Sequence, residues 1–342
     1  MLPRMADPVL SFTERGIYCP AADIYIDPWR PVPRALITHA HSDHARPGHG
    51  SYLATPVTAA MIRHRLGVEV ETLPYAEPRR IGSATVSFHP AGHVPGSAQV
   101  RVEVGGEVWV VSGDYKLEDD GLSEPFEPVR CHAFITECTF GLPVFRWQPQ
   151  AEIAAEINGW WRANRAAGRA SLLGAYSLGK AQRLISMLDP EIGPILTHGA
   201  VEGSNAVLRE IGAFDRETIP VTPDFDRKAH PAPMVVAPPS AFGTSWARKF
   251  GPAQTGFASG WMRLRGVRRR RGVQRGFVIS DHADWPALLR AIKEMGAENI
   301  YPTHGYTDIF AQYLRSEGYD ATPVPTEFGG EEDAAEKTGD AA

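Results

Sequence analysis

The sequence is poor in several features that mark particular classes of protein. Its 342 residues include only three cysteines, too few and too scattered for a disulfide framework. No run of about 18 apolar residues occurs, which excludes a membrane-spanning helix. The N-terminal segment has no continuous apolar stretch of the kind that a secretion signal requires. These absences predict a protein of the reducing cytoplasm.

Apolar material, by contrast, is plentiful. Hydrophobic residues make up 43% of the chain and charged residues 22%, which suits one large domain or two ordinary ones and excludes wholesale disorder. The net charge of −5 by itself gives no sign of a nucleic-acid partner, but the charge is unevenly placed. Residues 263–275 carry seven arginines and no acid. The segment from Glu331 carries five acids and one lysine, and we expect this tail to be disordered.

Strand-like and helical stretches alternate along most of the chain. A helix is predicted over Pro56–Leu66, capped by Thr55 and ended by Gly67. The N-terminal part otherwise reads as strands, including a hairpin around Gly105-Gly106, over residues 24–27, 35–38, 84–89, 100–104, 107–112 and 133–137. From about residue 148 strands and helices alternate as in a parallel sheet, with strands 172–175 and 195–197 between helices 150–167, 178–188 and 204–211. A proline-rich loop, 219–239, then precedes strand 277–279, helix 285–295 and strand 300–302.

A cluster of metal-ligand residues follows one of the predicted strands. The apolar segment Leu36-Ile37 runs directly into Thr38-His39-Ala40-His41-Ser42-Asp43-His44. Alternation at the strand end points His39 and His41 the same way, so both side chains can reach one cation. Asp43 and His44 then lie on the turn, where they can reach a neighbouring site. Imidazole nitrogens and carboxylate oxygens are ligands that suit zinc or manganese.

Further ligand candidates also follow apolar strands. His93 lies in the glycine-rich segment 90–98, Asp114 follows strand 107–112, and His304 follows strand 300–302. The two oxygens of Asp114 could bridge two cations, which a histidine cannot do. His198 also lies in a Thr-His-Gly triplet after an apolar strand; we favour His304 as the ligand and assign His198 a possible role in a substrate cleft.

The order of these residues along the chain resembles the motifs of the metallo-β-lactamase superfamily. Asp27, at the end of the preceding strand, resembles the first motif of that superfamily. Three further motifs resemble those of the β-CASP nucleases: motif A around Glu137, motif B in Ser280-Asp281-His282-Ala283-Asp284, and motif C in Thr303-His304-Gly305. Histidine at motif C differs from the aliphatic residue typical of the Artemis-like group. Within the family, the chain is most similar to the bacterial ligase-associated DNA exonucleases, and also similar to mRNA 3′-end processing factors.

This resemblance implies an α/β fold: a metallo-β-lactamase αββα sandwich with an inserted β-CASP α/β domain. We expect the metallo-β-lactamase domain over residues 1–147 and again over 273–328. The insert is expected over 148–272, and the acidic tail over 329–342.

The resemblance also implies two divalent metal ions, Zn or Mn. We assign the ligands in two overlapping sets: His39, His41, His93 and Asp114; and Asp43, His44, His304 and Asp114. Asp27 has a structural role beneath the loop. His282 is the candidate general acid and Glu137 orients it or modulates its charge, while Asp43 is assigned to the catalytic group as well as to the metal site.

Five residues are candidates for substrate binding. Arg268 and Arg270, in the arginine run before motif B, could follow a phosphate backbone, although a solvated linker would explain the run as well. Ser177 and Lys180 open a predicted helix whose N-terminus suits a phosphate, and capping alone would explain Ser177. His198 completes the set. Trp246, Phe250, Phe257 and Trp261 could stack bases, but aromatic residues in this number are more often part of the core.

The leading functional hypothesis is a two-metal DNA exonuclease, with a 5′-to-3′ preference, acting on single-stranded DNA or DNA ends in repair. A DNA ligase repair system is a candidate partner. An RNA exo- or endonuclease in RNA processing is the nearest alternative. A small-ester or thioester hydrolase would share the metal site but lack motifs A to C and the insert. A metal-free scaffold is disfavoured because every ligand position holds a ligand-type residue.

Overall fold

The computed structural model describes residues 8–270, 274–324 and 326, and the chain divides into two compact units. Of the described residues, the first unit comprises 8–119, 123–142, 285–324 and 326, and the second comprises 120–122, 143–270 and 274–284. The sequence prediction ended the insert at residue 272. In the structure strand β17 (Arg275–Phe277) pairs with the sheet of the second unit. The described chain through Asp284 belongs to that unit. The predicted acidic tail, 329–342, lies outside the described residues.

The first sheet of the first unit follows the chain order from β1 to β6. Its strands are β1 (Ser11–Thr13), β2 (Gly16–Cys19), β3 (Ile24–Ile26), β4 (Ala35–Leu36), β5 (Tyr52–Ala54) and β6 (Glu71–Thr72). The first three strands are antiparallel, and the strands from β3 onward are parallel. Helix α1 (Pro56–Leu66) connects β5 to β6. As predicted, Thr55 caps it by accepting the N–H of Thr58, and Gly67 ends it at φ +65°.

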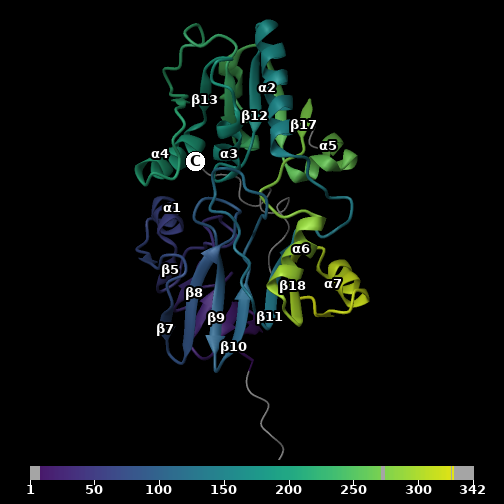
Figure 1. Cartoon of the computed structure of the whole chain (residues 1–342). Helices are drawn as coiled ribbons and strands as arrows, with labels where there is room; N and C mark the ends of the chain where they lie inside the picture. Colours follow the sequence, from purple (N-terminus) through teal and green to yellow (C-terminus); the bar gives the residue numbers. More distant parts are fainter. Residues whose placement is uncertain (1–7, 271–273, 325, 327–342) are drawn as a thin grey trace, which may run out of the picture. The chain divides into compact units, whose positions relative to one another are not determined.

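The second sheet combines an antiparallel half and a parallel half. Its order is β19 (Asp320–Ala321), β18 (Asn299–Gly305), β11 (Ala133–Cys138), β10 (Glu107–Val111), β9 (Ala98–Val104), β8 (Ala84–Pro90) and β7 (Arg79–Ile81). Strands β7 to β10 are antiparallel, and β10, β11, β18 and β19 are parallel. Helix α6 (Trp285–Met295) contacts β11, and α7 (Thr307–Ser316) packs on β18 and β19 (Figure 1).

One hydrophobic core joins the two sheets of this unit. It takes Ile24 and Ile26 from the first sheet and Phe88 and Val100 from the second, all at most 1% exposed. Alternate residues of each strand point into this core. The polar residues that follow the strands lie outside the core, at the ends of the strands. The ligand candidates follow β4, β8 and β10 or lie near the end of β18, so the packing of the two sheets determines where they lie.

The second unit is built on a parallel sheet of six strands. Its order is β14 (Ile219–Pro220), β13 (Ile195–Thr197), β15 (Met234–Ala237), β12 (Ala170–Gly174), β16 (Ala253–Ala258) and β17 (Arg275–Phe277). Its helices are α2 (Gln150–Ala166), α3 (Lys180–Met187), α4 (Gly199–Glu210) and α5 (Arg265–Arg270), with short 3-10 turns η1 (Pro239–Ala241), η2 (Ala247–Phe250) and η3 (Gly260–Arg263). Both units therefore confirm the predicted α/β class.

Several predicted elements differ from the structure. The segment predicted as a proline-rich loop contains β14 and β15, and β15 is an interior strand between β13 and β12. Strand β16 was not predicted. Helix α4 begins at Gly199 rather than at residue 204, because the Nδ1 of His198 accepts the N–H of Ala200 and caps the helix there. In the described part of the chain, no helix is long and apolar enough to cross a bilayer.

Candidate metal centre

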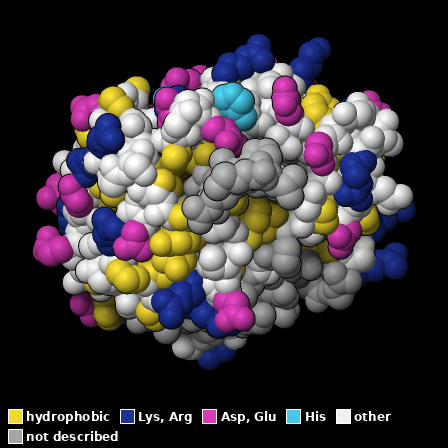
Figure 2. Space-filling view, turned by 90° about the horizontal axis from the view of Figure 1, so that it is seen from below, with side chains coloured by type: hydrophobic (Ala, Val, Ile, Leu, Met, Phe, Trp, Pro, Cys, Tyr) yellow, Lys and Arg dark blue, Asp and Glu magenta, His cyan; other side chains and the backbone are white. Residues whose placement is uncertain are grey.

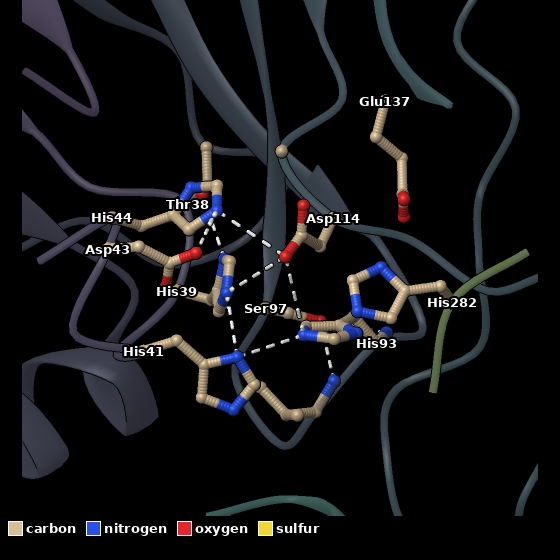
Figure 3. Close-up of polar contacts among 12 residues, drawn as sticks. Thr38, His39, His41, Asp43, His44, His93, Ser97, Asp114, Glu137 and His282 are labelled. Carbon is tan, nitrogen blue, oxygen red and sulfur yellow. Dashed lines mark hydrogen bonds and ion pairs between the residues drawn. The ribbon is translucent and has the colours of Figure 1, made fainter. Parts of the chain in front are cut away.

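Ligand-type side chains from four separate loops meet in the first unit (Figure 3). His39 follows β4, His93 follows β8, Asp114 follows β10, and His304 lies near the end of β18. His39, His44 and His93 are at most 1% exposed, and Asp114 is 6% exposed. Imidazoles and carboxylates are seldom buried together in this number unless they bind something.

The first group contains His39, His41, His93 and Asp114, whose ligand atoms all lie within 4.8 Å of one another. The Nδ1 of His41 is 3.1 Å from the Nε2 of His39 and 3.1 Å from the Nε2 of His93. Zinc–nitrogen distances of about 2.0–2.1 Å in a tetrahedron place ligand nitrogens roughly 3.3 Å apart. A cation would satisfy both contacts, whereas one ring nitrogen carries one hydrogen or one lone pair.

The second group shares Asp114 with the first and adds His44 and His304. Asp114 Oδ2 lies 3.4 Å from His44 Nε2, 3.5 Å from His39 Nε2 and 3.8 Å from His93 Nε2. Its other oxygen, Oδ1, lies 3.7 Å from the Nδ1 of His304. The carboxylate of Asp43 has one oxygen 3.9 Å from His44 Nε2. Asp114 thus lies between two sets of ligand atoms, as a bridging carboxylate would.

Asp27 lies directly beneath the histidine loop and holds it. One of its oxygens accepts a hydrogen bond from the backbone N–H of Thr38 at 2.8 Å, and the other accepts from the Thr38 hydroxyl at 2.6 Å. That second oxygen also lies 2.7 Å from the Nδ1 of His44. A carboxylate at Nδ1 fixes the ring and leaves Nε2 for the cluster, as carboxylates commonly do behind metal-bound histidines.

Two glycines allow the ligand loops to approach each other closely. A Cβ on Gly92, beside His93, would lie 2.1 Å from the carbonyl oxygen of Lys116. A Cβ on Gly113, beside Asp114, would lie 2.7 Å from the side chain of Thr38. Both glycines have positive φ, at +77° and +57°, which L-residues with side chains rarely adopt. Glycine is therefore required where two ligand loops pass each other.

Burial and neighbouring charges shift the pKa values of several histidines in the cluster. Burial, reinforced by neighbouring histidines, lowers the pKa of His39 well below its usual value and that of His304 to about 4. Both rings are therefore neutral near pH 7 and have a lone pair to donate. Burial also lowers the pKa of His44, but Asp114, Asp43 and Asp27 outweigh it and raise that pKa well above the usual value. The three carboxylates attract positive charge, and the imidazole nitrogens and carboxylate oxygens of the cluster suit divalent cations.

Glu137, at the end of β11, is 1% exposed in the first unit. Its Oε1 accepts the backbone N–H of Tyr115 at 2.8 Å, one residue after Asp114. Its own N–H donates to the hydroxyl of Ser112 at 3.2 Å. The motif A carboxylate is therefore tied to the loop that carries the shared ligand.

His282 belongs to the second unit and is 3% exposed. Its N–H donates to the Ser280 hydroxyl at 3.1 Å, and its carbonyl accepts the indole N–H of Trp147 at 2.9 Å. The backbone of motif B is thus fixed on both sides of the histidine.

Ser177 and Lys180, the predicted phosphate-binding pair, do not both open helix α3 as predicted. The helix begins at Lys180 rather than at residue 178. Lys180 is 1% exposed and its Nζ lies 3.7 Å from Asp281 Oδ2, so its charge faces the interior instead of a surface. Ser177 is half-buried before the helix. His198 is half-buried, caps α4, and packs its ring edge against Trp246 at 4.8 Å between centroids.

The arginine run is an exposed cationic surface of the second unit. Arg263, Arg265, Arg268 and Arg269 are exposed, and among the described residues none of them forms an ion pair with a carboxylate. Arg275 pairs with Glu156 at 2.5 Å, and the side chain of Arg270 lies outside the described residues. In contrast, Lys/Arg and Asp/Glu side chains are interspersed on the described part of the face shown in Figure 2.

Phe250, Phe257 and Trp261 are buried, which leaves Trp246 the most accessible of the four aromatic candidates.

Sequence reasoning did not find every residue that builds the site. Thr38 and Ser97 hold Asp27 and the His93 loop; the Ser97 hydroxyl accepts the N–H groups of His93 and Val94 at 3.1 and 3.2 Å. A serine four residues after His93 resembles any loop serine. Only its placement directly after Gly96, in the loop between two strands, could have suggested the role.

Comparisons with known proteins agree with the motifs. The chain is 30% identical over 313 residues to a protein named Probable DNA ligase from Opitutus terrae, which is 90% of this chain and 30% of that protein. It is 29% identical over 146 residues to Endoribonuclease YSH1 of Yarrowia lipolytica, covering 42% of this chain and 17% of that one. It is 28% identical over 187 residues to a ribonuclease of Thermus thermophilus, covering 46% and 43%. The chain spans less than half the length of each of these relatives.

No family model matches the chain. Among solved structures, a protein of unknown function from Enterococcus faecalis matches with a TM-score of 0.56 and 12% identity, covering 86% of this chain and 79% of that one. That likeness concerns the fold alone. The names of these relatives are consistent with the ordered motifs, which resemble those of the β-CASP nucleases.

Proposed function

We propose that the chain is a two-metal phosphodiester hydrolase that degrades DNA from an end. The observation that carries this proposal is Asp114, whose Oδ2 lies near His39 and His93 of the first group and near His44 of the second, while its Oδ1 lies near His304 of the second group. Two divalent cations held by such a pair of groups would neutralise charge on a phosphodiester and lower the pKa of the attacking water. Zinc and manganese both suit nitrogen and oxygen ligands of this kind.

The residues then divide by role. His39, His41 and His93 would hold one cation, His44, His304 and Asp43 the other, and Asp114 would bridge them. Asp27 would orient His44 without binding metal itself. His282 would donate the proton to the leaving oxygen, and Glu137 would orient its ring, because a histidine near neutrality can deliver a proton at physiological pH.

The finer fold assignment is part of the same proposal. We assign the first unit to the metallo-β-lactamase sandwich and the second unit to the β-CASP insert. Two sheets that share one core, with helices packed on the strands of each, support the first assignment. A parallel sheet inserted between residues 142 and 285 supports the second.

DNA is the substrate that we favour. The relative that matches 90% of this chain is named a DNA ligase, and this chain aligns with 30% of that protein. A nuclease that works beside a ligase would prepare DNA ends in repair, with a 5′-to-3′ direction as our working assignment. The exposed arginines of α5 would contact phosphates, because guanidinium groups bind phosphate oxygens strongly and such binding weakens with salt.

RNA is the second candidate substrate. Two relatives are named ribonucleases, although each matches less than half of this chain. Hydrolysis of a phosphodiester by two cations does not depend on a 2′-hydroxyl, so a metal cluster of this kind would serve either polymer.

The direct test uses purified chain with Mn²⁺ or Mg²⁺ and matched single-stranded DNA and RNA, labelled at either end. Stepwise loss of mononucleotides from one end of DNA, strongly slowed by His282→Ala, supports the exonuclease and gives its direction. Cleavage of RNA with intact DNA would move the chain to RNA processing. Binding of metal with cleavage of neither would refute the nuclease and favour a small-ester hydrolase.

A further inference from the structure

A cluster of buried ionisable side chains lies within the second unit. It contains Lys180 and Arg183 of α3 together with Asp120 and Asp281. The four side chains are between 1% and 8% exposed. Burying charged groups is costly unless they are paired and hydrogen-bonded, so the contacts of each group decide what the cluster does.

Arg183 connects three distant parts of the chain. Its Nη1 donates to the carbonyl of Ser280 at 2.6 Å and to Asp281 Oδ1 at 3.0 Å. Its Nε donates to the side-chain oxygen of Gln150 at 2.7 Å and lies 3.9 Å from Asp120 Oδ2. Lysine could not make this set of contacts, because only guanidinium presents donors in a rigid planar fork.

The same segment is held from the other side by Trp147. Its backbone N–H donates to Asp284 Oδ2 at 2.8 Å, and its indole N–H donates to the carbonyl of His282 at 2.9 Å. Arg183 therefore fixes residues 280 and 281, and Trp147 fixes residues 282 and 284. His282 is therefore held through its own carbonyl and directly follows the two residues that Arg183 contacts.

A direct role in binding phosphate does not fit this arrangement. The Nζ of Lys180 lies 3.7 Å from Asp281 and 4.7 Å from the centre of the Tyr176 ring, with 1% of the side chain exposed. A substrate phosphate would have to displace Asp281 to reach either cation. Two cations facing two carboxylates also leave the cluster balanced, with no surplus charge for an anion.

We propose that Arg183 and Trp147 are positioning residues that hold the motif B segment so that His282 presents its ring for proton transfer. This inference rests on the proposed nuclease function. Proton transfer depends on heavy-atom distances of about 2.6–3.2 Å, so a small displacement of the segment lowers the rate without changing substrate affinity. Asp281, which faces both Lys180 and Arg183, extends the same support.

The test measures kcat and KM of the metal-loaded full chain for Arg183→Gln, Arg183→Lys and Trp147→Phe. For Arg183→Gln we expect kcat to fall about 10-fold or more, with KM within about 2-fold of the wild type. Arg183→Lys should retain an intermediate rate, and Trp147→Phe should lose less than Arg183→Gln. The matched control is Arg162→Gln, which removes an arginine of the same unit that pairs with Asp189 on the surface.

The decisive comparison repeats Arg183→Gln in the His282→Ala background. If Arg183 acts through His282, the second substitution there changes the residual rate by less than about 2-fold, because coupled residues are not additive. Equal losses in both backgrounds, or a rise in KM alone, would overturn the inference. If Arg183→Gln fails to fold, as shown by circular dichroism, the same cycle with Trp147→Phe decides the question. An inactive wild type would instead refute the nuclease itself.

Discussion

The metal centre of the first unit and the buried charge cluster of the second unit differ in how their groups are matched. In the charge cluster, Lys180 and Arg183 face Asp120 and Asp281, so each charge has an opposite partner. In the metal centre, ring nitrogens face one another, and the Nδ1 of His41 lies 3.1 Å from two of them. Buried charges that are paired with opposite charges can stabilise the fold by themselves. Buried ring nitrogens that face one another have lone pairs that a bound cation would satisfy.

The largest effect should come from Asp114→Asn, which removes the charge shared by the two ligand groups. We expect the nuclease rate to fall about 10³-fold or more, since metal-assisted charge stabilisation supplies several kcal/mol. The rate is measured with end-labelled DNA at saturating Mn²⁺. Asp320→Asn, an exposed aspartate of the same unit, is the control and should keep wild-type activity. Wild-type activity in Asp114→Asn would show that the shared carboxylate is not part of the reaction.

A smaller effect is expected from Asp27→Asn, because Asp27 contacts the ligand His44 and is not itself a proposed ligand. Loss of such a partner typically weakens metal binding about 10–100-fold. The activity of the variant should therefore fall at limiting metal and recover when metal is in excess, as followed by metal titration. Asp23→Asn, which removes an exposed carboxylate paired with Arg34, should leave the titration unchanged. An equal loss at all metal concentrations would contradict a role through metal affinity.

The independence of the two regions can be tested with Leu173→Ala. Leu173 is fully buried in β12, between two parallel neighbours. Removing a buried leucine side chain costs about 2–5 kcal/mol, and the loss should appear in the urea unfolding of the second unit. The metal content of the folded variant should remain at the wild-type level. Val144→Ala, at an exposed position, serves as the control. Loss of metal in the native variant would show that the two regions are not separate.

The smallest effect concerns Glu202 in α4. Burial raises the pKa of its carboxyl, but hydrogen bonds from Thr197, Thr218 and Arg209 outweigh this and lower it overall. A folded-state pKa below the unfolded value stabilises the protein above the unfolded pKa, and this stability is lost as the pH falls through the folded value. Glu202→Gln should therefore lower Tm by about 1–3 °C near pH 7 and by progressively less toward acid. A pH-independent difference in calorimetry would contradict this linkage.

The two regions also differ in how much of each the sequence revealed. The ligand loops were found because each ligand-type residue directly follows an apolar strand, and the ends of packed strands meet at one edge. The capped helix Pro56–Leu66 was found from local signals alone. The charge cluster was not, because Asp120, Gln150, Arg183 and Asp281 share no spacing and meet only through the folded second unit. For the same reason the sequence predicted a phosphate-binding role for Lys180 and gave no sign of its contact with Asp281.

Strand β15 shows a second limit of the sequence. Met234–Ala237 is a short apolar run after a proline-rich stretch, and the prolines indicated a loop. In the sheet it pairs on both sides with β12 and β13, so its burial comes from neighbours that lie 20 or more residues away in the chain. Tertiary contacts decide such a strand, and local propensity cannot.

The most direct measurement is the number of divalent cations bound per chain, determined by elemental analysis after equilibration with Zn²⁺ or Mn²⁺ and removal of unbound metal. The account predicts two cations for the wild type, one or none for Asp114→Asn, and two for the Asp320→Asn control. A wild-type chain that binds no cation, or an Asp114→Asn chain that still binds two, would contradict the central claim that Asp114 joins two metal sites.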